Sequence, residues 1–347
     1  MRSRSRLSLA THAALLAALA GCAGDDSPSI LDPSSGAGRR VAGLWWMLFW
    51  ISVVAVAVVV GMIAVAIVRR HRPDATEGEG DGVGAGSDDI DRSPVAWGDR
   101  FVVLSGIVVT GVVLAVSFVV SLFVLNDLAA PAERQPLKIE VVAHTWWWEV
   151  RYPGGAVTAN EIHIPVGEPV EVRLRTADVI HSFWVPELQV KQDLVPGMDN
   201  HLSLEADHAG RFRGQCAEYC GLQHAHMVFF VRAQPPAEFQ DWLADQGRPA
   251  ADPTSALAQQ GRTTFEGSSC AGCHTIRGTT ADGVLGPDLT HLAGRETIGA
   301  GVDRLDPDTL ARWIANAQDD KPGASMPPTE LTPAQVDAVV AYLMGLE

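Results

Sequence analysis

The chain has 347 residues, with 26 Lys and Arg against 41 Asp and Glu, and a formal net charge of −15. This length allows two soluble domains in addition to membrane-spanning segments. The excess of acid argues against a nucleic-acid partner, because phosphate would be repelled, and favours a basic protein partner.

The first 22 residues have the pattern of a bacterial export signal. A basic stretch, MRSRSR, precedes the short apolar run LSLATHAALLAALA, and LAGC follows at 19–22. An ordinary secretory signal is one interpretation. LAGC also resembles the bacterial lipobox, which implies lipidation of Cys22 and its conversion into the new N-terminus. Both interpretations predict an exported protein.

Two long runs without charged residues come next, at 41–68 and 101–125. Each exceeds the ~20 residues that a helix needs to cross the hydrocarbon core of a membrane, so both are predicted to be transmembrane helices. Arg69, Arg70 and Arg72 follow the first run, and basic residues favour the cytoplasmic side. The Gly- and Asp-rich linker 69–100 is therefore expected to be cytoplasmic and flexible, with the remainder of the chain on the outer side of the cell membrane.

Residues 131–247 are predicted to form an all-β domain. Segments rich in β-branched and aromatic residues alternate with turn signals such as YPGG (152–155), and this spacing predicts a β-sandwich or Greek-key barrel. A short amphipathic helix at 236–247 ends the domain.

Within this domain the stretch GQCAEYCGLQHAHM (214–227) gathers potential metal ligands. A disulfide between Cys216 and Cys220 would suit an oxidising compartment but would leave the neighbouring His and Met unexplained. Zinc rarely takes a thioether such as Met227, whereas thiolate, imidazole and thioether together favour copper. A second imidazole is available from His181. One cysteine suits a single copper ion, and two cysteines can bridge two.

HSFWVPEL (181–188), PGMDN (196–200) and GQCAEYCGLQHAHM together resemble the dinuclear copper (CuA) domain of the cytochrome c oxidase subunit II family. The resemblance covers about residues 40–247, including both apolar runs, and implies a cupredoxin-like fold. It also implies a copper ligand set with two bridging thiolates, one imidazole for each copper, a weak thioether and a backbone carbonyl: Cys216, Cys220, His181, His224, Met227 and Glu218.

The resemblance carries further expectations. It implies that the side chain of Glu218 helps to hold a magnesium ion at the junction with subunit I. His226 competes with His224 on spacing alone, and the family spacing favours His224.

In HTWWWEV (144–150) the resemblance implies that Trp146 receives electrons at the surface, while Trp148 is expected in the core. Asp99 lies in the region of a carboxylate that guards a proton channel in the family, but the match is weak.

Residues 253–347 are predicted to form a second, all-α domain. CAGCH (270–274) is the c-type haem attachment signature, in which Cys270 and Cys273 form thioethers and His274 binds the iron. Helices are expected at 256–267, after Asp306-Pro307-Asp308, and after the capping box Thr332-x-x-Gln335.

The sixth iron ligand could come from Met326, Met344 or His291. Met326 lies in the Gly/Pro loop GASMPP (323–328), free of helical constraint, whereas Met344 falls on the apolar face of the last helix. Met/His ligation raises the potential of such a haem. The domain resembles class I cytochrome c, in which a Met-Pro loop supplies this ligand and a Gly-Pro, here Gly286-Pro287, flanks the proximal His.

The copper domain fused to a cytochrome c domain resembles the caa-type haem–copper oxidase. This implies an electron-input subunit that relays electrons from an external donor through haem c and CuA to subunit I, where oxygen is reduced and protons are pumped. The implied partners are subunits I and III and a donor such as a cytochrome c or a quinol–cytochrome c reductase. The alternatives are a CuA subunit of another terminal reductase, such as a nitric oxide reductase, and a membrane-tethered carrier without a catalytic partner.

Overall fold

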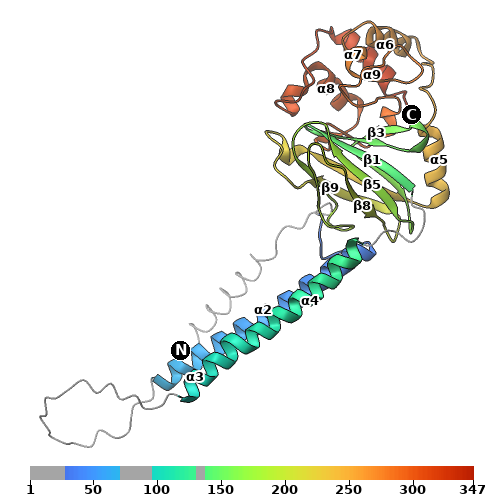
Figure 1. Ribbon diagram of the computed structural model, residues 1–347. Helices are drawn as coiled ribbons and strands as arrows, with labels where there is room; N and C mark the ends of the chain where they lie inside the picture. The colour runs from blue at the N-terminus through green and yellow to red at the C-terminus, as the bar shows by residue number, and fades with distance from the viewer. Residues whose placement is uncertain (1–27, 71–95, 130–136) are drawn as a thin grey trace, which may run out of the picture. The chain divides into compact units, whose positions relative to one another are not determined.

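The computed structural model describes residues 28–70, 96–129 and 137–347 (Figure 1). The predicted signal and lipidation site at Cys22 lie outside the described residues, as does most of the linker 69–100. Contacts divide the chain into two compact units, one of Met1–Gly36 with Ala132–Glu347 and one of Ala37–Pro131.

The described residues of the unit Ala37–Pro131 are helical. Its elements are α2 (Gly36–Arg70), α3 (Ala96–Val103), the π-helical turn η1 (Leu104–Val109) and α4 (Thr110–Ala129). Two helical stretches, Gly36–Arg69 and Arg100–Leu128, have mean hydropathies of 3.1 and 2.8, and no residue of their most apolar windows is buried. Such helices are long and apolar enough to cross a membrane, which supplies the apolar surroundings that their exposed Val, Ile and Phe side chains require.

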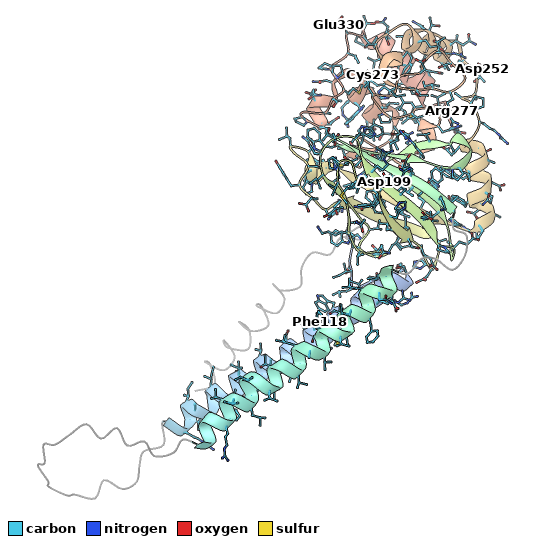
Figure 2. The ribbon with its side chains drawn as sticks, viewed as in Figure 1. Phe118, Asp199, Asp252, Cys273, Arg277 and Glu330 are labelled. Carbon is cyan, nitrogen blue, oxygen red and sulfur yellow. The ribbon has the colours of Figure 1, made fainter. Side chains whose placement is uncertain are left out.

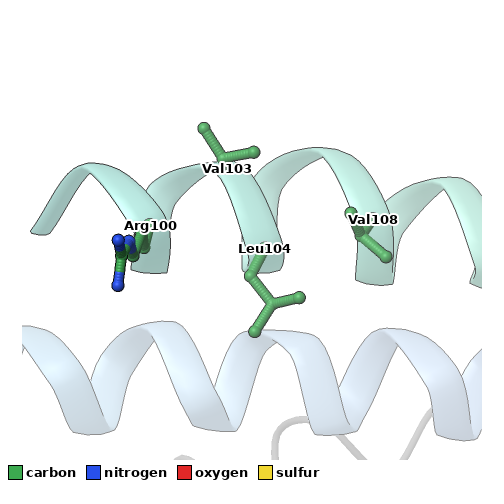
Figure 3. A pocket seen from close by; sticks show the side chains of 4 residues that line it. All are labelled: Arg100, Val103, Leu104 and Val108. Atoms are coloured by element: carbon green, nitrogen blue, oxygen red, sulfur yellow. The ribbon is translucent and has the colours of Figure 1, made fainter. Parts of the chain in front are cut away.

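This helical unit contains one open hollow of about 430 Å³, lined by Arg100, Val103, Leu104 and Val108 (Figure 3). Leu104 points toward the neighbouring helix and Val103 points away from it. None of the four lining residues is a predicted ligand, and three of them are aliphatic, so the hollow belongs to the apolar surface of the helix.

The first part of the other unit is a sandwich of two five-stranded sheets, here called the β lobe. One sheet has the strand order β3-β2-β1-β5-β8 and the other has β4-β10-β9-β6-β7. The strands are β1 (Leu137–His144), β2 (Trp147–Arg151), β3 (Val157–Ala159), β4 (Glu161–Pro165), β5 (Val170–Thr176), β6 (His181–Trp184), β7 (Gln192–Leu194), β8 (Asn200–Leu204), β9 (Gly210–Cys216) and β10 (Val228–Gln234). The helix α5 (Pro236–Gln246) follows the last strand, as predicted.

Alternating side chains build the core of the β lobe. In β5 the residues Val170, Val172 and Leu174 are fully buried while their neighbours face outward, which is the two-residue period of a half-buried strand. Trp148 is 0% exposed, and its ring meets that of Phe229 edge to face at a centroid distance of 5.0 Å. The prediction that Trp148 is a core residue is confirmed.

The second part of this unit is helical and is here called the cytochrome lobe (residues 253–347). Its elements are α6 (Ala256–Glu266), α7 (Cys270–Cys273), η4 (Leu292–Gly294), β11 (Thr297–Ile298), β12 (Asp303–Arg304), α8 (Pro307–Asp320) and α9 (Pro333–Leu343). The α6 and α9 helices pack closely at Gly261, where an added Cβ would lie 1.9 Å from the carbonyl oxygen of Ala338. Any larger residue would separate these helices.

The predicted helix starts of the cytochrome lobe are confirmed. Asp306 caps α8 by accepting a hydrogen bond of 2.9 Å from the amide of Thr309. Gln335 accepts one of 2.9 Å from the amide of Thr332, which completes the capping box of α9. These caps satisfy amides that have no partner within the helix and so fix where each helix begins.

Candidate metal centres

The predicted copper ligands lie on the loop between β9 and β10 and at the start of β6. Antiparallel pairing of β6 with β9 sets Phe183 opposite Cys216. His181 therefore lies in β6, two residues before the partner of Cys216 and in the same sheet. After Cys216 the chain leaves β9, passes through the 3₁₀ turn η3 (His224–His226) and re-enters the sheet at Val228. The loop is therefore anchored at both ends by strands of one sheet.

The sulfur and nitrogen atoms of these residues converge. The Sγ atoms of Cys216 and Cys220 are 3.7 Å apart. His181 Nδ1 is 3.8 Å from Cys216 Sγ, and His224 Nδ1 is 3.6 Å from Cys220 Sγ. The structure brings all six predicted donors together: Met227 Sδ is 3.8 Å from Cys220 Sγ, and the carbonyl oxygen of Glu218 is 3.2 Å from Cys216 Sγ.

An aspartate missed by the sequence analysis orients one of the histidines. The Nε2 atom of His181 lies 2.8 Å from Asp178 Oδ1, which leaves Nδ1 free to face the thiols. Burial opposes the charge on Asp178, but hydrogen bonds from His181, Val179 and Thr145 outweigh it and lower its pKa to about 2. An ionised carboxylate behind a ligating imidazole fixes its tautomer and strengthens it as a ligand. The Asp three residues before His181 was the available sequence signal.

The two thiols lie too close together to ionise independently. Their mutual contact, supported by His181, lowers the pKa of Cys216 to about 3 despite its burial. The same contact raises the pKa of Cys220, because a second thiolate at this distance would repel the first. A pair of thiolates so close together requires compensating positive charge, which a metal ion supplies by displacing the proton.

Two further residues beside this cluster have defined roles. The indole Nε1 of Trp146 donates to the carbonyl oxygen of Cys220 at 2.9 Å, so this ring, although partly buried, contacts the copper loop directly. The Nδ1 atom of His226 lies 2.7 Å from Gln223 Oε1, and the side chain is exposed. The geometry thus directs His224, and not His226, at the thiols.

The haem attachment residues lie in the cytochrome lobe, where Figure 2 labels Cys273. Cys270 is the first residue of the short helix α7 and Cys273 is its last, and both thiols are free. The Nδ1 atom of His274 lies 2.8 Å from the carbonyl oxygen of Pro287, which leaves Nε2 available for a metal. Burial lowers the pKa of His274 and keeps the imidazole neutral, the form that binds iron.

The predicted Gly286-Pro287 pair supports this histidine closely. A Cβ at Gly286 would lie 2.5 Å from His274 Cε1, so only glycine allows the loop to approach the ring. Nearby, Arg295 is an unexpected cation that is partly buried. Its Nη2 donates to the carbonyl oxygen of Asp288, while its buried Nε has no partner among the described residues. A haem carries two propionates, which suit an unsatisfied guanidinium beside the proximal histidine.

The three candidates for the sixth ligand differ in their surroundings. Both ring nitrogens of His291 are engaged, with Nδ1 2.7 Å from the carbonyl oxygen of Glu347 and Nε2 3.1 Å from that of Arg248. Met344 packs against the apolar core of the lobe. Met326 lies in the loop after α8, and its carbonyl accepts from Gln318 Nε2 at 2.8 Å. Among the described residues its thioether makes no hydrogen bond, so Met326 fits the sixth ligand better than His291 or Met344.

The arrangement fits the groups that the sequence predicts. Two thiols, two Nδ1 atoms, a thioether and a carbonyl form a soft donor set of the kind that copper prefers. The neutral His274, the two free thiols of α7 and the unsatisfied Arg295 suit a covalently bound haem.

Comparisons with known proteins agree with both lobes. The family described as cytochrome c oxidase subunit II, periplasmic domain, matches residues 156–234. The cytochrome c family matches residues 258–347. The two matches fall on the β lobe and on the cytochrome lobe.

Individual relatives extend the likeness over the whole chain. Cytochrome c oxidase subunit 2 of Alkalihalophilus pseudofirmus is 34% identical over 95% of this chain and 94% of its own length. The subunit of the same name from Bacillus sp. (strain PS3) is 34% identical over 68% of this chain and 70% of its own. A crystal structure of the periplasmic domain of the Bradyrhizobium japonicum subunit II is 32% identical, covers 33% of this chain and 94% of that chain, and gives a TM-score of 0.31.

Proposed function

The chain belongs to the cytochrome c oxidase subunit 2 family, and we propose that it carries electrons from a haem c in its cytochrome lobe to a dinuclear CuA centre in its β lobe. It is the electron-input subunit of a haem–copper oxidase, an oxidoreductase complex. The observation that carries the proposal is the convergence of two thiols and two imidazole Nδ1 atoms on one loop cluster, with Cys216 and Cys220 3.7 Å apart.

The candidate ligands of the β lobe would each have a distinct role in binding copper. Cys216 and Cys220 would bridge the two ions, His181 and His224 would each bind one, and Met227 and the Glu218 carbonyl would complete the set. When bound, such a centre accepts and releases one electron at a time, and the haem does the same. The sandwich keeps the ligands nearly fixed, which lowers the structural rearrangement that each transfer requires.

The residues of the cytochrome lobe would hold the haem. Cys270 and Cys273 would form thioethers, and His274 and Met326 would bind the iron axially. The Pro287 carbonyl fixes the tautomer of His274. Methionine opposite histidine favours the reduced iron and so a high potential.

Several finer assignments complete the proposal. Both lobes would lie on the outer side of the cell membrane, anchored by two membrane-crossing helices and, if Cys22 is lipidated, by a lipid. Subunit I would receive the electrons, with subunit III in the same complex, and the Glu218 side chain would contribute to a magnesium site facing subunit I. An external cytochrome c or a quinol–cytochrome c reductase would supply the electrons to the acidic chain.

Metal and spectral analysis of the purified oxidase complex tests the proposal. We expect two copper ions and one covalent haem c in this subunit, and an electron paramagnetic resonance signal in which one unpaired electron is shared by both coppers. A single copper ion, or zinc in its place, would refute the CuA assignment. Absence of covalent haem would refute the assignment of a haem c to the cytochrome lobe.

A further inference from the structure

Lys321 is a buried lysine in an unusual position between the two lobes. It follows α8 in the cytochrome lobe, and its side chain is only 3% exposed. Its Nζ donates to the carbonyl oxygens of Trp146 at 2.8 Å, His226 at 2.7 Å and Gly299 at 2.7 Å. The first two acceptors belong to the β lobe and the third to the cytochrome lobe.

The three acceptors match the three N–H bonds of a lysine ammonium group. Burial disfavours the charge and, although the nearby Cys220 opposes the shift, lowers the pKa of Lys321 to about 7. Three carbonyl oxygens within 2.8 Å replace the lost water and favour the charged form. Within the described part of the chain no carboxylate pairs with this Nζ, so the side chain binds backbone carbonyls and forms no ion pair.

One of the three carbonyls that Lys321 binds, that of His226, belongs to the copper loop, and the carbonyl of Trp146 belongs to the turn that contacts this loop. His226 lies between the predicted ligands His224 and Met227, and Trp146 donates in turn to the carbonyl oxygen of Cys220. A second bond joins the same two loops, since Gln223 Nε2 donates to the carbonyl oxygen of Pro322 at 2.7 Å. A Cβ at Gly323 would lie 3.1 Å from the side chain of Leu222 and 3.7 Å from the ring of Trp146, so the backbone at Gly323 packs closely on side chains of the β lobe.

On the cytochrome side the same loop carries Met326. Gln318 braces it by donating to the carbonyl oxygens of Ala324 at 2.7 Å and Met326 at 2.8 Å, and by accepting from the amide of Gly323 at 2.8 Å. The loop 321–326 is therefore a braced unit that ends at the predicted iron ligand. Lys321 fastens its beginning to the copper loop.

A separate contact holds the lobes together elsewhere. The buried carboxylate of Glu161, in β4, accepts from the amides of Glu296 at 2.7 Å and Thr297 at 3.1 Å. Glu296 in turn pairs with Arg211 at 2.9 Å and with Arg232. Because this contact lies at other residues, docking of the lobes as a whole does not depend on Lys321 alone.

We propose that Lys321 is a positioning residue that fastens the Met326 loop of the cytochrome lobe to the copper loop of the β lobe, with Trp146 between them. The cytochrome lobe is then a fixed donor and not a swinging carrier, and the carbonyl of His226 is one of the points of attachment. The inference deepens the proposed function and rests on it for the direction of electron flow; the docking itself does not require the cofactors.

Lys321→Met tests the inference, because it keeps the length of the side chain and removes its charge and donors. In the purified complex we expect hydrogen exchange at the amides of Gly323, Ala324 and His226 to rise by at least about tenfold, since three carbonyls that join the two lobes lose their donor. The rate at which one electron leaves the haem and reduces the copper centre after photoreduction should fall by a similar factor, with both cofactor spectra unchanged.

Two control variants show whether the effects of Lys321→Met are specific to this lysine. Lys138→Met removes an exposed lysine of the β lobe that contacts only Glu171, at 3.0 Å, and should change neither measurement. Glu296→Gln weakens the separate contact, and should raise exchange at Thr297 while the amides of Gly323 and Ala324 stay protected. If Lys321→Met prevents assembly, Gln223→Leu removes the neighbouring bond and should raise the same amide exchange by a smaller factor.

The outcomes separate the inference from the function it rests on. Native exchange in Lys321→Met, or in Gln223→Leu where the first variant does not assemble, would overturn the positioning role whether or not electrons pass. Failure of the unaltered protein to transfer an electron from haem to copper would overturn the proposed function, and it would leave the exchange result standing.

Discussion

The proposed copper cluster and the proposed haem pocket would each hold a redox centre, but the protein builds them by different means. The copper donors come from β6 and one loop, and non-ligands such as Asp178 and Trp146 already hold them within reach of each other. The haem residues Cys270, Cys273 and His274 come from one short local motif, and the group they bind would itself complete the core. The candidate copper site thus depends on the folding of the β-sandwich, which brings distant residues together. The candidate haem site depends on one short sequence motif, around which the cytochrome lobe packs.

The largest expected effect tests whether the two centres are independent. Cys216→Ser should reduce the copper content of the subunit at least about tenfold, because one bridging thiolate is lost, while the haem content stays unchanged. Cys273→Ala should do the reverse and leave the haem without its second covalent bond. Metal analysis and a haem stain after denaturing electrophoresis measure both. Loss of both centres in either variant would contradict the comparison.

A second prediction concerns the more loosely held ligand of the haem pocket. Met326→Ala should remove the spectral signature of sulfur–iron ligation and lower the haem midpoint potential by on the order of 0.1 V, a fraction of the range that axial ligands span. Met344→Leu, a change within the core, is the matched control and should leave both unchanged. If Met344→Leu loses the signature instead, the assignment of the sixth ligand is wrong.

A third prediction tests the preorganisation of the copper site. Asp178→Asn keeps the size of the side chain but removes the carboxylate behind His181, and copper affinity should fall by about 10–100-fold. Competition with a copper chelator measures it. Asp199→Asn, at an exposed aspartate bonded to Arg173, is the control and should bind copper normally. Equal affinity in the two variants would show that His181 needs no support.

A fourth prediction concerns the stability of the β lobe, away from the proposed metal site. Burial lowers the pKa of His163 to about 4, and the neutral ring stacks on Trp242 at a centroid distance of 3.9 Å. Because the unfolded histidine binds a proton more readily, stability is complete above pH ~6.5 and is lost as the pH falls toward ~4, by up to about 3 kcal/mol.

Denaturant unfolding between pH 4 and 7, followed by tryptophan fluorescence, measures this loss. His163→Gln should reduce the pH dependence of the β-lobe transition, since the group that titrates is gone. An unchanged slope would show that other groups, such as carboxylates at the interface of the lobes, govern the acid sensitivity.

Comparison of sequence and structure shows where prediction from residues was sufficient. In CAGCH and in the stretch from Cys216 to Met227, the close spacing predicts that the side chains lie close in space. The roles of these residues, and the participation of the distant His181 and Met326, rest on the family resemblance and stay predictions. The helix caps at Asp306 and Thr332 were predictable from close spacing as well. Asp178 and Arg295 were missed because a single charged residue outside a motif carries little signal.

The sequence alone therefore determined the chemistry of this protein: two apolar helices, a soft donor set for copper and an attachment motif for haem. Only the tertiary structure decided that Nδ1 of His181 and His224 faces the thiols, that Trp146 contacts the copper loop, and that Lys321 joins the two lobes. Lys321 and Trp146 are 175 residues apart in the chain. A contact over that separation depends on how both lobes fold and dock, and no local pattern encodes it.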